Sequence, residues 1–319
     1  MRVSTNMFFS KNLDNVLKQQ NEILNLQSQM ATGLRVNKAS DDPFAKTTFL
    51  ASNEALVMTN QFQRNIDYAQ SRGKLIDTSI GAMTDVMTNV KERMIQAAND
   101  TLSAADRRNI AAELRVNLQQ LLNTANVRDE TGRFVFAGIT DDTPAFNVEG
   151  QPVNNDPAAL NDLYKFTGSE SVNELQISRE IKIPIDVSGK ELLTLEDGDP
   201  ATSYFSLLQQ TIDVLEGNTF SGSPVQTAKN AMDVLGSKMD EIFDKTLVAR
   251  TRVGARLRQV EETQLANLTL ATQYEMTSGK AVGVDFTKSV SEIARMQLSL
   301  EAAQRAYSQF SKLSVFNFL

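Results

Sequence analysis

The stretch "FQRNIDYAQSRGKLIDTSIGAMTDVMTNVKERMIQA", residues 62–97, decides the fold class. Uncharged residues recur in it at steps of alternately four and three positions: Phe62, Ile66, Ala69, Gly73, Ile76, Ile80, Met83, Met87, Val90, Met94 and Ala97. This spacing is the heptad pattern of a coiled-coil seam, which lies along one face of a helix. The sequence therefore predicts a long helix that packs against at least one other helix.

The start of this helix is marked by "KASDDPFAK", residues Lys38–Lys46. The adjacent carboxylates of Asp41 and Asp42 could hold a metal ion or move a proton, or they could begin a helix. Asp is favoured at the N-cap and Pro at the first helical position, and negative charge is stabilised at that end of the helix dipole. The further oxygen ligands of a calcium loop do not follow. We therefore interpret Asp41, Asp42 and Pro43 as a helix-start turn.

Proline separates two helical flanks from a different middle. Six of the seven prolines lie between residues 144 and 224, and the flanks are nearly free of this helix-breaking residue. The middle carries the short apolar runs "GRFVFAG", "LYKFTG" and "LQISREIKIPIDVSG". Such runs, bounded by Gly, Asn, Asp and Pro, are typical of strands. We expect a small β-rich module between the long helices.

The C-terminal flank repeats the heptads of the N-terminal flank from residue 228 to residue 274. Polar residues weaken this seam at Arg256, Thr263 and Asn267. Two glycines within Thr277–Asp285 are expected to break the helix, because glycine is a poor helix former. The aspartate at the end of that stretch then caps a last helix.

Both chain ends are apolar-striped, poor in charge and rich in Asn, Gln, Ser and Ala. The two helices could pair with each other alone, or their stripes could be completed by other subunits. Chain ends usually fray and vary, so regular seams there favour the second interpretation. The predicted assembly interface comprises Leu13, Leu17, Leu24, Met30, Leu34, Phe286, Ile293, Met296, Leu300, Tyr307 and Phe310.

Composition argues against several function classes. The chain has no Cys and no His, which removes the thiol nucleophile, the usual general base and the usual zinc ligands. We find no catalytic motif and expect no enzyme activity, no cofactor and no metal. No apolar run reaches the roughly 18 residues of a membrane span. The N-terminus has no signal-peptide h-region, so the residues alone favour a cytoplasmic protein, although export of an uncut chain remains compatible.

A basic stretch, "VARTRVGARLRQVEE", raises the question of nucleic-acid binding. Its arginines are followed by Glu261 and Glu262 at helical pairing distance, and no aromatic residues lie between them. The net charge of −7 also disfavours a phosphate backbone as partner. We interpret the stretch as a solvated, salt-bridged helix face and expect no nucleic-acid partner.

The predicted fold is mainly α, with long coiled-coil helices from both chain ends and a small β-rich module inserted in the middle. Its expected parts are an N-terminal core helix and turn (1–42), a long helical hairpin (43–132), a small β-rich outer module (133–202), returning long helices (203–284) and a C-terminal core helix (285–319).

Three stretches resemble the flagellin superfamily. "ATGLRVNKASDDPFAK" is similar to the N-terminal flagellin signature, and "RTRVGARLRQVE" to a segment of the returning helix. "DFTKSVSEIARMQLSLEAAQRAYSQFSKLSVFNFL" is similar to the flagellin C-terminal helix. They occur in the family's order and cover roughly two thirds of the chain.

Within that superfamily the chain is more similar to the hook–filament junction branch than to flagellins. The start "MRVSTNMFF", Pro43 after the second aspartate, "TGRFVFAG" directly after the third helix and the end "SVFNFL" carry this similarity. The middle module is also small. The resemblance implies a structural adaptor that joins the hook end to the flagellin filament. The alternatives are a short flagellin that forms the filament itself and, in another class, an enzyme or nucleic-acid binder.

The resemblance also implies a mechanism and partners. The terminal helices would pair into a coiled-coil inner core that stacks with copies of itself, with the preceding hook-associated protein and with flagellin. A flagellar export chaperone would bind the C-terminal region. The chain would pass uncleaved through the flagellar type III apparatus to an extracellular place in the flagellum, which overrides the cytoplasmic expectation.

Overall fold

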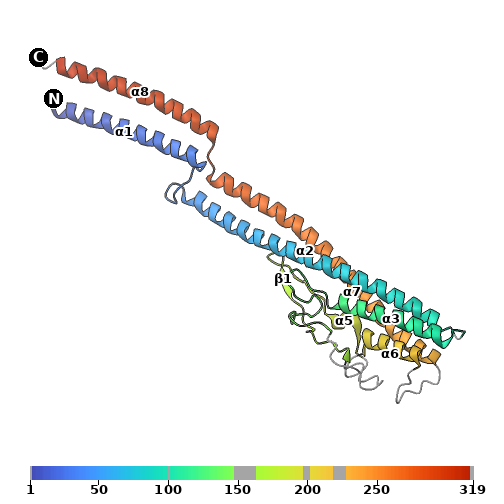
Figure 1. Cartoon of the computed structure of the whole chain (residues 1–319). Helices are drawn as coiled ribbons and strands as arrows, with labels where there is room; N and C mark the ends of the chain where they lie inside the picture. The colour runs from blue at the N-terminus through green and yellow to red at the C-terminus, as the bar shows by residue number, and fades with distance from the viewer. Residues whose placement is uncertain (1, 100, 147–162, 197–201, 218–227, 317–319) are drawn as a thin grey trace. The chain divides into compact units, whose positions relative to one another are not determined.

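The computed structural model describes residues 2–99, 101–146, 163–196, 202–217 and 228–316 (Figure 1). The chain divides into two compact units. The first unit contains residues 1–60 and 269–319, and the second contains residues 61–268. No described helix is both long and apolar enough to cross a membrane.

The first unit is built from helices at both chain ends. It contains α1 (Arg2–Thr32), the first part of α2 (Pro43–Ala97), the last part of α7 (Ala228–Val282) and α8 (Phe286–Phe316). Helices α1 and α8 lie side by side and run in opposite directions (Figure 1). At the end of this pair, Leu34 forms an isolated antiparallel bridge with Gly283.

The second unit packs four helices around an apolar core. The remaining part of α2 and of α7 pack with α3 (Ala104–Ala125) and α6 (Tyr204–Glu216). Helix α3 begins with a capping box between Ser103 and Asp106, which satisfies backbone amides at its free end. The heptad residues of α2 that lie in this core are fully or nearly fully buried: Ile76, Ile80, Met83, Met87, Val90, Met94 and Ala97. Ile66 and Ala69 are buried in a second, smaller cluster.

Two small sheets belong to the same unit. β1 (Glu174–Gln176) pairs antiparallel with β2 (Lys182–Pro184), and β3 (Thr194–Leu195) pairs antiparallel with β4 (Thr202–Ser203). A short helix, α5 (Gly189–Leu193), lies between β2 and β3. The first hairpin is held on the long helices because Ile177 and Ile183 are buried together with Ile66, Ala69 and Val260.

The mainly helical class with a small strand-containing middle is confirmed. The middle holds less strand than the apolar runs predict. "GRFVFAG" forms a buried irregular segment, in which the Phe134 amide donates to the Asp141 carbonyl and the Phe136 carbonyl accepts from the Gly189 amide. "LYKFTG" contributes one isolated bridge, between Phe146 and Phe166. Both runs are apolar because they are buried, and their backbone groups bond outside a regular ladder.

Two expectations for α7 hold only in part: the helix ends within Thr277–Asp285 as expected, but at only one of the two glycines, and its arginines form ion pairs with other carboxylates than those expected. The helix continues through Gly279 as far as Val282, and it ends where the Gly283 amide donates to the Gly279 carbonyl. One glycine inside a long helix costs only about 1 kcal/mol relative to alanine, and flanking turns compensate for it. The arginines of this helix also do not pair with Glu261 and Glu262. Arg250 pairs with Asp77, and Arg252 pairs with Glu191.

The polar positions that weaken the α7 heptads hold the strand-containing segment in place. Asn267 is buried, and its side-chain amide donates to the Ile177 carbonyl at 2.8 Å. Arg256 donates to the carbonyl of Asp186 at 3.3 Å. These side chains satisfy backbone carbonyls that a leucine at the same position would leave without a partner.

A buried charge cluster lies at the centre of the second unit. Arg72, on α2, is 4% exposed and donates to the carboxylates of Asp186, which is fully buried, and Asp129. The side-chain amide of Asn173 donates to the second oxygen of Asp186 at 2.8 Å. Burial opposes the charge, but the Asp186 carboxylate outweighs it and raises the pKa of Arg72. The cluster therefore ties α2 to two separate connections of the middle segment.

Candidate assembly surface and its turn

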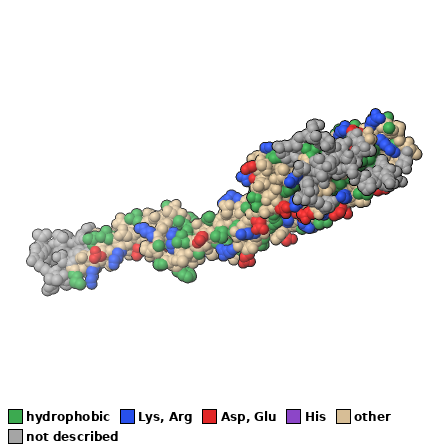
Figure 2. All heavy atoms as spheres, turned by 90° about the horizontal axis from the view of Figure 1, so that it is seen from below, with side chains coloured by type: hydrophobic (Ala, Val, Ile, Leu, Met, Phe, Trp, Pro, Cys, Tyr) green, Lys and Arg blue, Asp and Glu red, His purple; other side chains and the backbone are tan. Residues whose placement is uncertain are grey.

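The terminal pair leaves most of its apolar stripe uncovered. Of the predicted interface residues, Leu13 is 52% exposed, Leu24 is 57% exposed, and Leu17, Leu34 and Phe286 are also exposed. Figure 2 shows hydrophobic side chains at the surface along this part of the molecule. Among the described side chains of α1 and α8, only Ile23 is a buried apolar one. Pairing within one chain therefore does not complete this seam.

The other predicted residues divide into two groups. Met30, Ile293, Met296 and Leu300 are partly buried. A polar contact between the two helices is formed where the Gln19 side-chain amide donates to the Ser299 hydroxyl at 3.2 Å. Tyr307 and Phe310 fall on α8, and their side chains lie outside the described residues.

Sequence reasoning missed several exposed apolar residues of the same unit. Phe44 is 83% exposed on the first turn of α2, and Leu298 is 70% exposed on α8. Others are Leu50, Val57, Leu270, Met276 and Val290. Most of them lie off the four–three seams, so a search for one stripe per helix does not collect them. Leu270 stands in the α7 heptads, and Val290 lies four residues after Phe286 and three before Ile293. Counting apolar residues on all faces of each helix could have found them.

The helix-start turn uses its two carboxylates in different ways. Asp41 closes its own loop, because its Oδ2 accepts from the amides of Asn37 at 3.1 Å and Lys38 at 2.8 Å. Asp42 caps α2, because its Oδ1 accepts from the Ala45 amide at 3.0 Å. Its Oδ2 accepts from both Nη atoms of Arg35 at 3.2 Å. Helix α2 then begins at Pro43.

Hydrogen bonds hold this turn to the link between α7 and α8. The Arg35 amide donates to the Val282 carbonyl at 2.7 Å, and the Val284 amide donates to the Gly33 carbonyl at 3.0 Å. The Arg35 guanidinium also donates to the Ala281 carbonyl at 3.0 Å. We call these two connections, residues 33–42 and 283–285, the double turn.

A small core and one glycine with a left-handed backbone complete the double turn. Val36, Ala45 and Val282 are buried together, with Phe49 and Ala281 against them. Gly33 has φ of +71°, a left-handed conformation that favours glycine. Sequence reasoning missed Gly33, Arg35 and Val36 as parts of the site, although all three stand in the quoted stretch "ATGLRVNKASDDPFAK".

The charges of the turn act as a helix cap at the start of α2. The hydrogen bond from the Ala45 amide, together with the Arg35 guanidinium, holds the pKa of Asp42 below its ordinary value. The carboxylates accept from amides and from one arginine. No group of His, Cys, Asp or Glu that could hold a metal ion occurs among the described residues. The described surface of this unit offers exposed apolar side chains, which suit binding to another protein.

Comparison with known proteins places this architecture. The family model of the bacterial flagellin N-terminal helical region matches residues 3–141. Flagellar hook-associated protein 3 of Escherichia coli is 26% identical over 99% of both chains. The flagellar filament 41 kDa core protein of Borreliella burgdorferi is 22% identical over 55% of this chain and 53% of its own.

Solved structures share the fold. The flagellar junction protein FlgL from Legionella pneumophila superposes with a TM-score of 0.55 at 16% identity, over 74% of this chain and all of that chain.

The long terminal helices and the motifs at both chain ends are thus similar to those of flagellin-superfamily proteins. The similarity to hook-associated protein 3 extends along the whole chain, whereas the similarity to the filament core protein covers about half of it. The resemblance that the sequence motifs carry, including the similarity to the junction branch, is thereby confirmed.

Proposed function

We propose that this protein is a structural adaptor of the bacterial flagellum, which joins the hook end to the flagellin filament by coiled-coil stacking of its terminal helices. The similarity to hook-associated protein 3 over the full chain supports this role. The short-flagellin alternative is not favoured, because the likeness to filament proteins covers only part of the chain.

The incomplete seam of α1 and α8 is the observation that carries the mechanism. Apolar surface that stays exposed to water raises the free energy by roughly 25 cal/mol per Å² relative to buried surface. The apolar stripe on these two long helices is exposed in this way. Burial against neighbouring subunits recovers this free energy. The partners in this proposal are copies of the chain, the preceding hook-associated protein and flagellin. Leu13, Leu17, Leu24 and Phe286 supply the contacts between subunits.

The proposal assigns a position to each part of the chain. Residues 1–42 and 285–319 form the inner core, residues 43–132 and 203–284 form the next layer, and residues 133–202 face outward. A head-to-tail interface of this kind continues until a different protein ends it, which suits a junction between two unlike assemblies. This role requires binding surfaces and no catalysis.

Delivery to the flagellum is part of the same proposal. The chain leaves the cell uncleaved through the flagellar type III apparatus, with an export chaperone on its C-terminal region. Most of the stability of a helix in a protein comes from packing. Terminal helices that bury little of their surface are therefore only marginally stable before assembly, and they can unfold easily to pass through an export channel. The absence of cysteine from the sequence means that no disulfide must form after export.

The test is complementation of a strain that lacks this chain. Such a strain is expected to show hooks without filaments in electron micrographs, and the full chain should restore filaments. A variant that lacks Met296–Leu319 should not restore them, although purified variant protein should keep a cooperatively folded second unit. Filaments restored by the truncated variant would contradict the core role of α8.

A second measurement separates the adaptor from the short flagellin. Purified full chain is added to filament seeds at rising concentration. We expect it to bind the seed ends without elongation. Growth of long filaments from this chain alone would overturn the adaptor role and support the flagellin alternative.

A further inference from the structure

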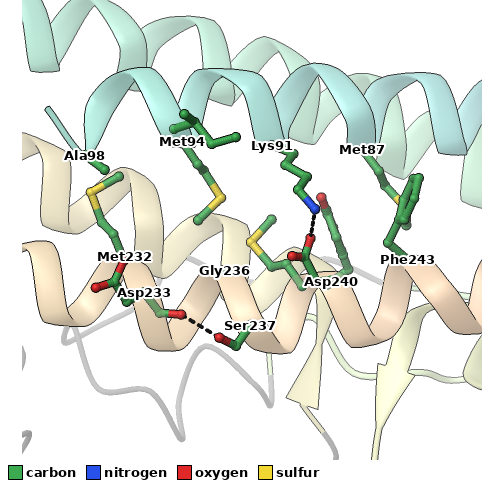
Figure 3. Close-up of a pocket in the computed structure, with 13 residues that line it drawn as sticks. Met87, Lys91, Met94, Ala98, Met232, Asp233, Gly236, Ser237, Asp240 and Phe243 are labelled. Carbon is green, nitrogen blue, oxygen red and sulfur yellow. Dashed lines mark hydrogen bonds and ion pairs between the residues drawn. The ribbon is translucent and has the colours of Figure 1, made fainter.

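A methionine-lined pocket in the second unit has no use in the role proposed above. It lies between α2 and α7, with a volume of about 220 Å³, and Met87, Met94, Met232 and Met239 line it together with Tyr204. Figure 3 shows Met94 and Met232 reaching into this space from the two opposite helices. A cavity of roughly 150 Å³ already accommodates a benzene ring. The pocket therefore has room for one aromatic side chain but not for a drug-sized ligand.

The lining suits an aromatic occupant. Methionine is flexible, and its polarisable sulfur makes favourable contacts with aromatic rings. Four methionines can adjust around an inserted ring, and their side chains are nearly buried without one. A well-packed core would fill this volume with its own side chains.

Gly236 keeps the pocket open. It stands inside α7, where glycine costs about 0.5–1 kcal/mol relative to alanine. Its backbone does not need glycine, because its φ is not positive. A Cβ atom there would meet only the Met94 methyl carbon, at an ordinary contact distance of 3.7 Å. Packing within this chain therefore does not exclude a side chain at position 236.

The mouth of the pocket is charged and has an exposed apolar residue at its rim. Lys91 pairs with Asp240 at 2.8 Å, so these charges cancel, whereas Asp233 has no ion-pair partner in the described part of the chain (Figure 3). Among the described residues that line the pocket, one net negative charge remains. Ile95, which lines the pocket, is 67% exposed at the rim. An apolar pocket with such a rim matches an interface anchor site.

We propose that this pocket binds an aromatic side chain of another protein, carried on a segment with an adjacent lysine or arginine. The ring enters between the methionines, and the cation lies near Asp233. Ile95 covers the neighbouring part of the segment. This inference does not depend on the flagellar role, so either can fail without the other.

The test uses the full chain with ¹³C-labelled methionine methyl groups and the peptide acetyl-Lys-Phe-Lys-amide as probe. Titration should shift the methyl signals of Met87, Met94, Met232 and Met239. The signals of Met7 and Met276, which are both 55% exposed, should not move. Acetyl-Lys-Ala-Lys-amide should cause no shift. Acetyl-Glu-Phe-Glu-amide should bind about threefold more weakly, as expected for losing one exposed charge pair.

Matched variants locate the binding. Gly236→Leu fills the pocket and should weaken probe binding by about tenfold or more. Gly254→Leu places the same side chain on the same helix at a site with no atom within 4 Å, and it should leave binding unchanged. Asp233→Asn, at an exposed position, should weaken binding of the basic probe to the level of the acidic one. This variant provides the test if Gly236→Leu does not fold.

Three outcomes would overturn the inference. They are no shift of the pocket methionines, equal shifts at Met7 and Met276, and unchanged binding in both Gly236→Leu and Asp233→Asn.

Discussion

The terminal helix pair and the second unit bury their apolar residues to very different degrees. Helices α1 and α8 have 31 residues each, and Ile23 is their only buried apolar side chain among those described. In the second unit, α2, α3, α6 and α7 share one continuous core, and even an arginine is buried with its carboxylates. In the proposed role, neighbouring subunits cover the exposed residues of the terminal pair, whereas the second unit has its own core. Under that proposal, subunits remain single until they reach the assembly site.

The largest expected effect comes from charging the exposed seam. Leu17→Asp combined with Leu24→Asp would bury two unpaired carboxylates at the proposed interface, at a cost of several kcal/mol. Junction formation should be lost, as measured by filaments per hook in electron micrographs. The thermal midpoint of the isolated chain should hardly change, since both side chains are exposed.

Asn25→Asp is the matched control for the charged seam, because it adds a carboxylate beside Leu24 at an exposed polar position. It should assemble normally. If the double variant also assembles, or if it unfolds the isolated chain, the seam is not the interface between subunits.

The next effect concerns the buried charges of the second unit. Asp186→Ala leaves Arg72 buried beside fewer carboxylates, and breaking such a pair typically costs about 3–5 kcal/mol. Denaturant unfolding followed by circular dichroism measures this loss. Asp77→Ala removes an exposed partner of Arg250 and should cost less than about 1 kcal/mol. Equal losses in the two variants would contradict a special role of the cluster.

Hydrogen exchange compares the two regions without substitution. In the free chain the amides of Phe286, Ile293, Leu300 and Tyr307 should exchange on the order of 100-fold faster than core amides of α2, because local opening is easy where few contacts are buried. After assembly onto hooks these amides should become slow. Slow exchange in the free chain would show that the pair is stable without neighbours.

The smallest effect is expected at the double turn. The pKa of Asp42 in the folded state lies below the ordinary value of 3.8, so its carboxylate stabilises the turn above that pH. The contribution is lost as pH falls through the folded-state pKa. Asp42→Asn can still cap α2 but loses the charge next to Arg35, and it should remove this acid-side dependence. The measurement is the hydrogen-exchange rate of the Ala45 amide at pH values from about 2 to about 5, a range that brackets the ordinary pKa of an aspartate. An unchanged pH profile in the variant would assign the dependence to another carboxylate.

The sequence predicted what depends on local pattern. The heptads of residues 62–97 predicted a buried helix face, and Pro43 predicted where α2 begins. Contacts between distant residues could not be predicted in this way. Arg72 is next to the seam in sequence, but its partners stand 57 and 114 positions away, so the pattern gave no sign of its burial.

The site shows the same limit. The terminal stripes and both aspartates of the turn were visible as patterns of residue types. The bonds of Arg35 to Val282 and Ala281 join segments 246 and more positions apart, and no spacing rule connects them. "GRFVFAG" was predicted as a strand because apolar content reports burial, while the backbone partners that decide strand or loop are supplied by the rest of the fold.

The double turn has a consequence for how chain length can change. It fixes α1 and α8 to each other at one end, and the two helices have equal lengths. An insertion or deletion in one helix therefore shifts every residue between it and the chain end relative to the partner helix. A loss of about seven residues, two helical turns, from α1 would be tolerated only with a similar loss from α8. The lengths of two segments that lie more than 250 residues apart in the chain must therefore change together.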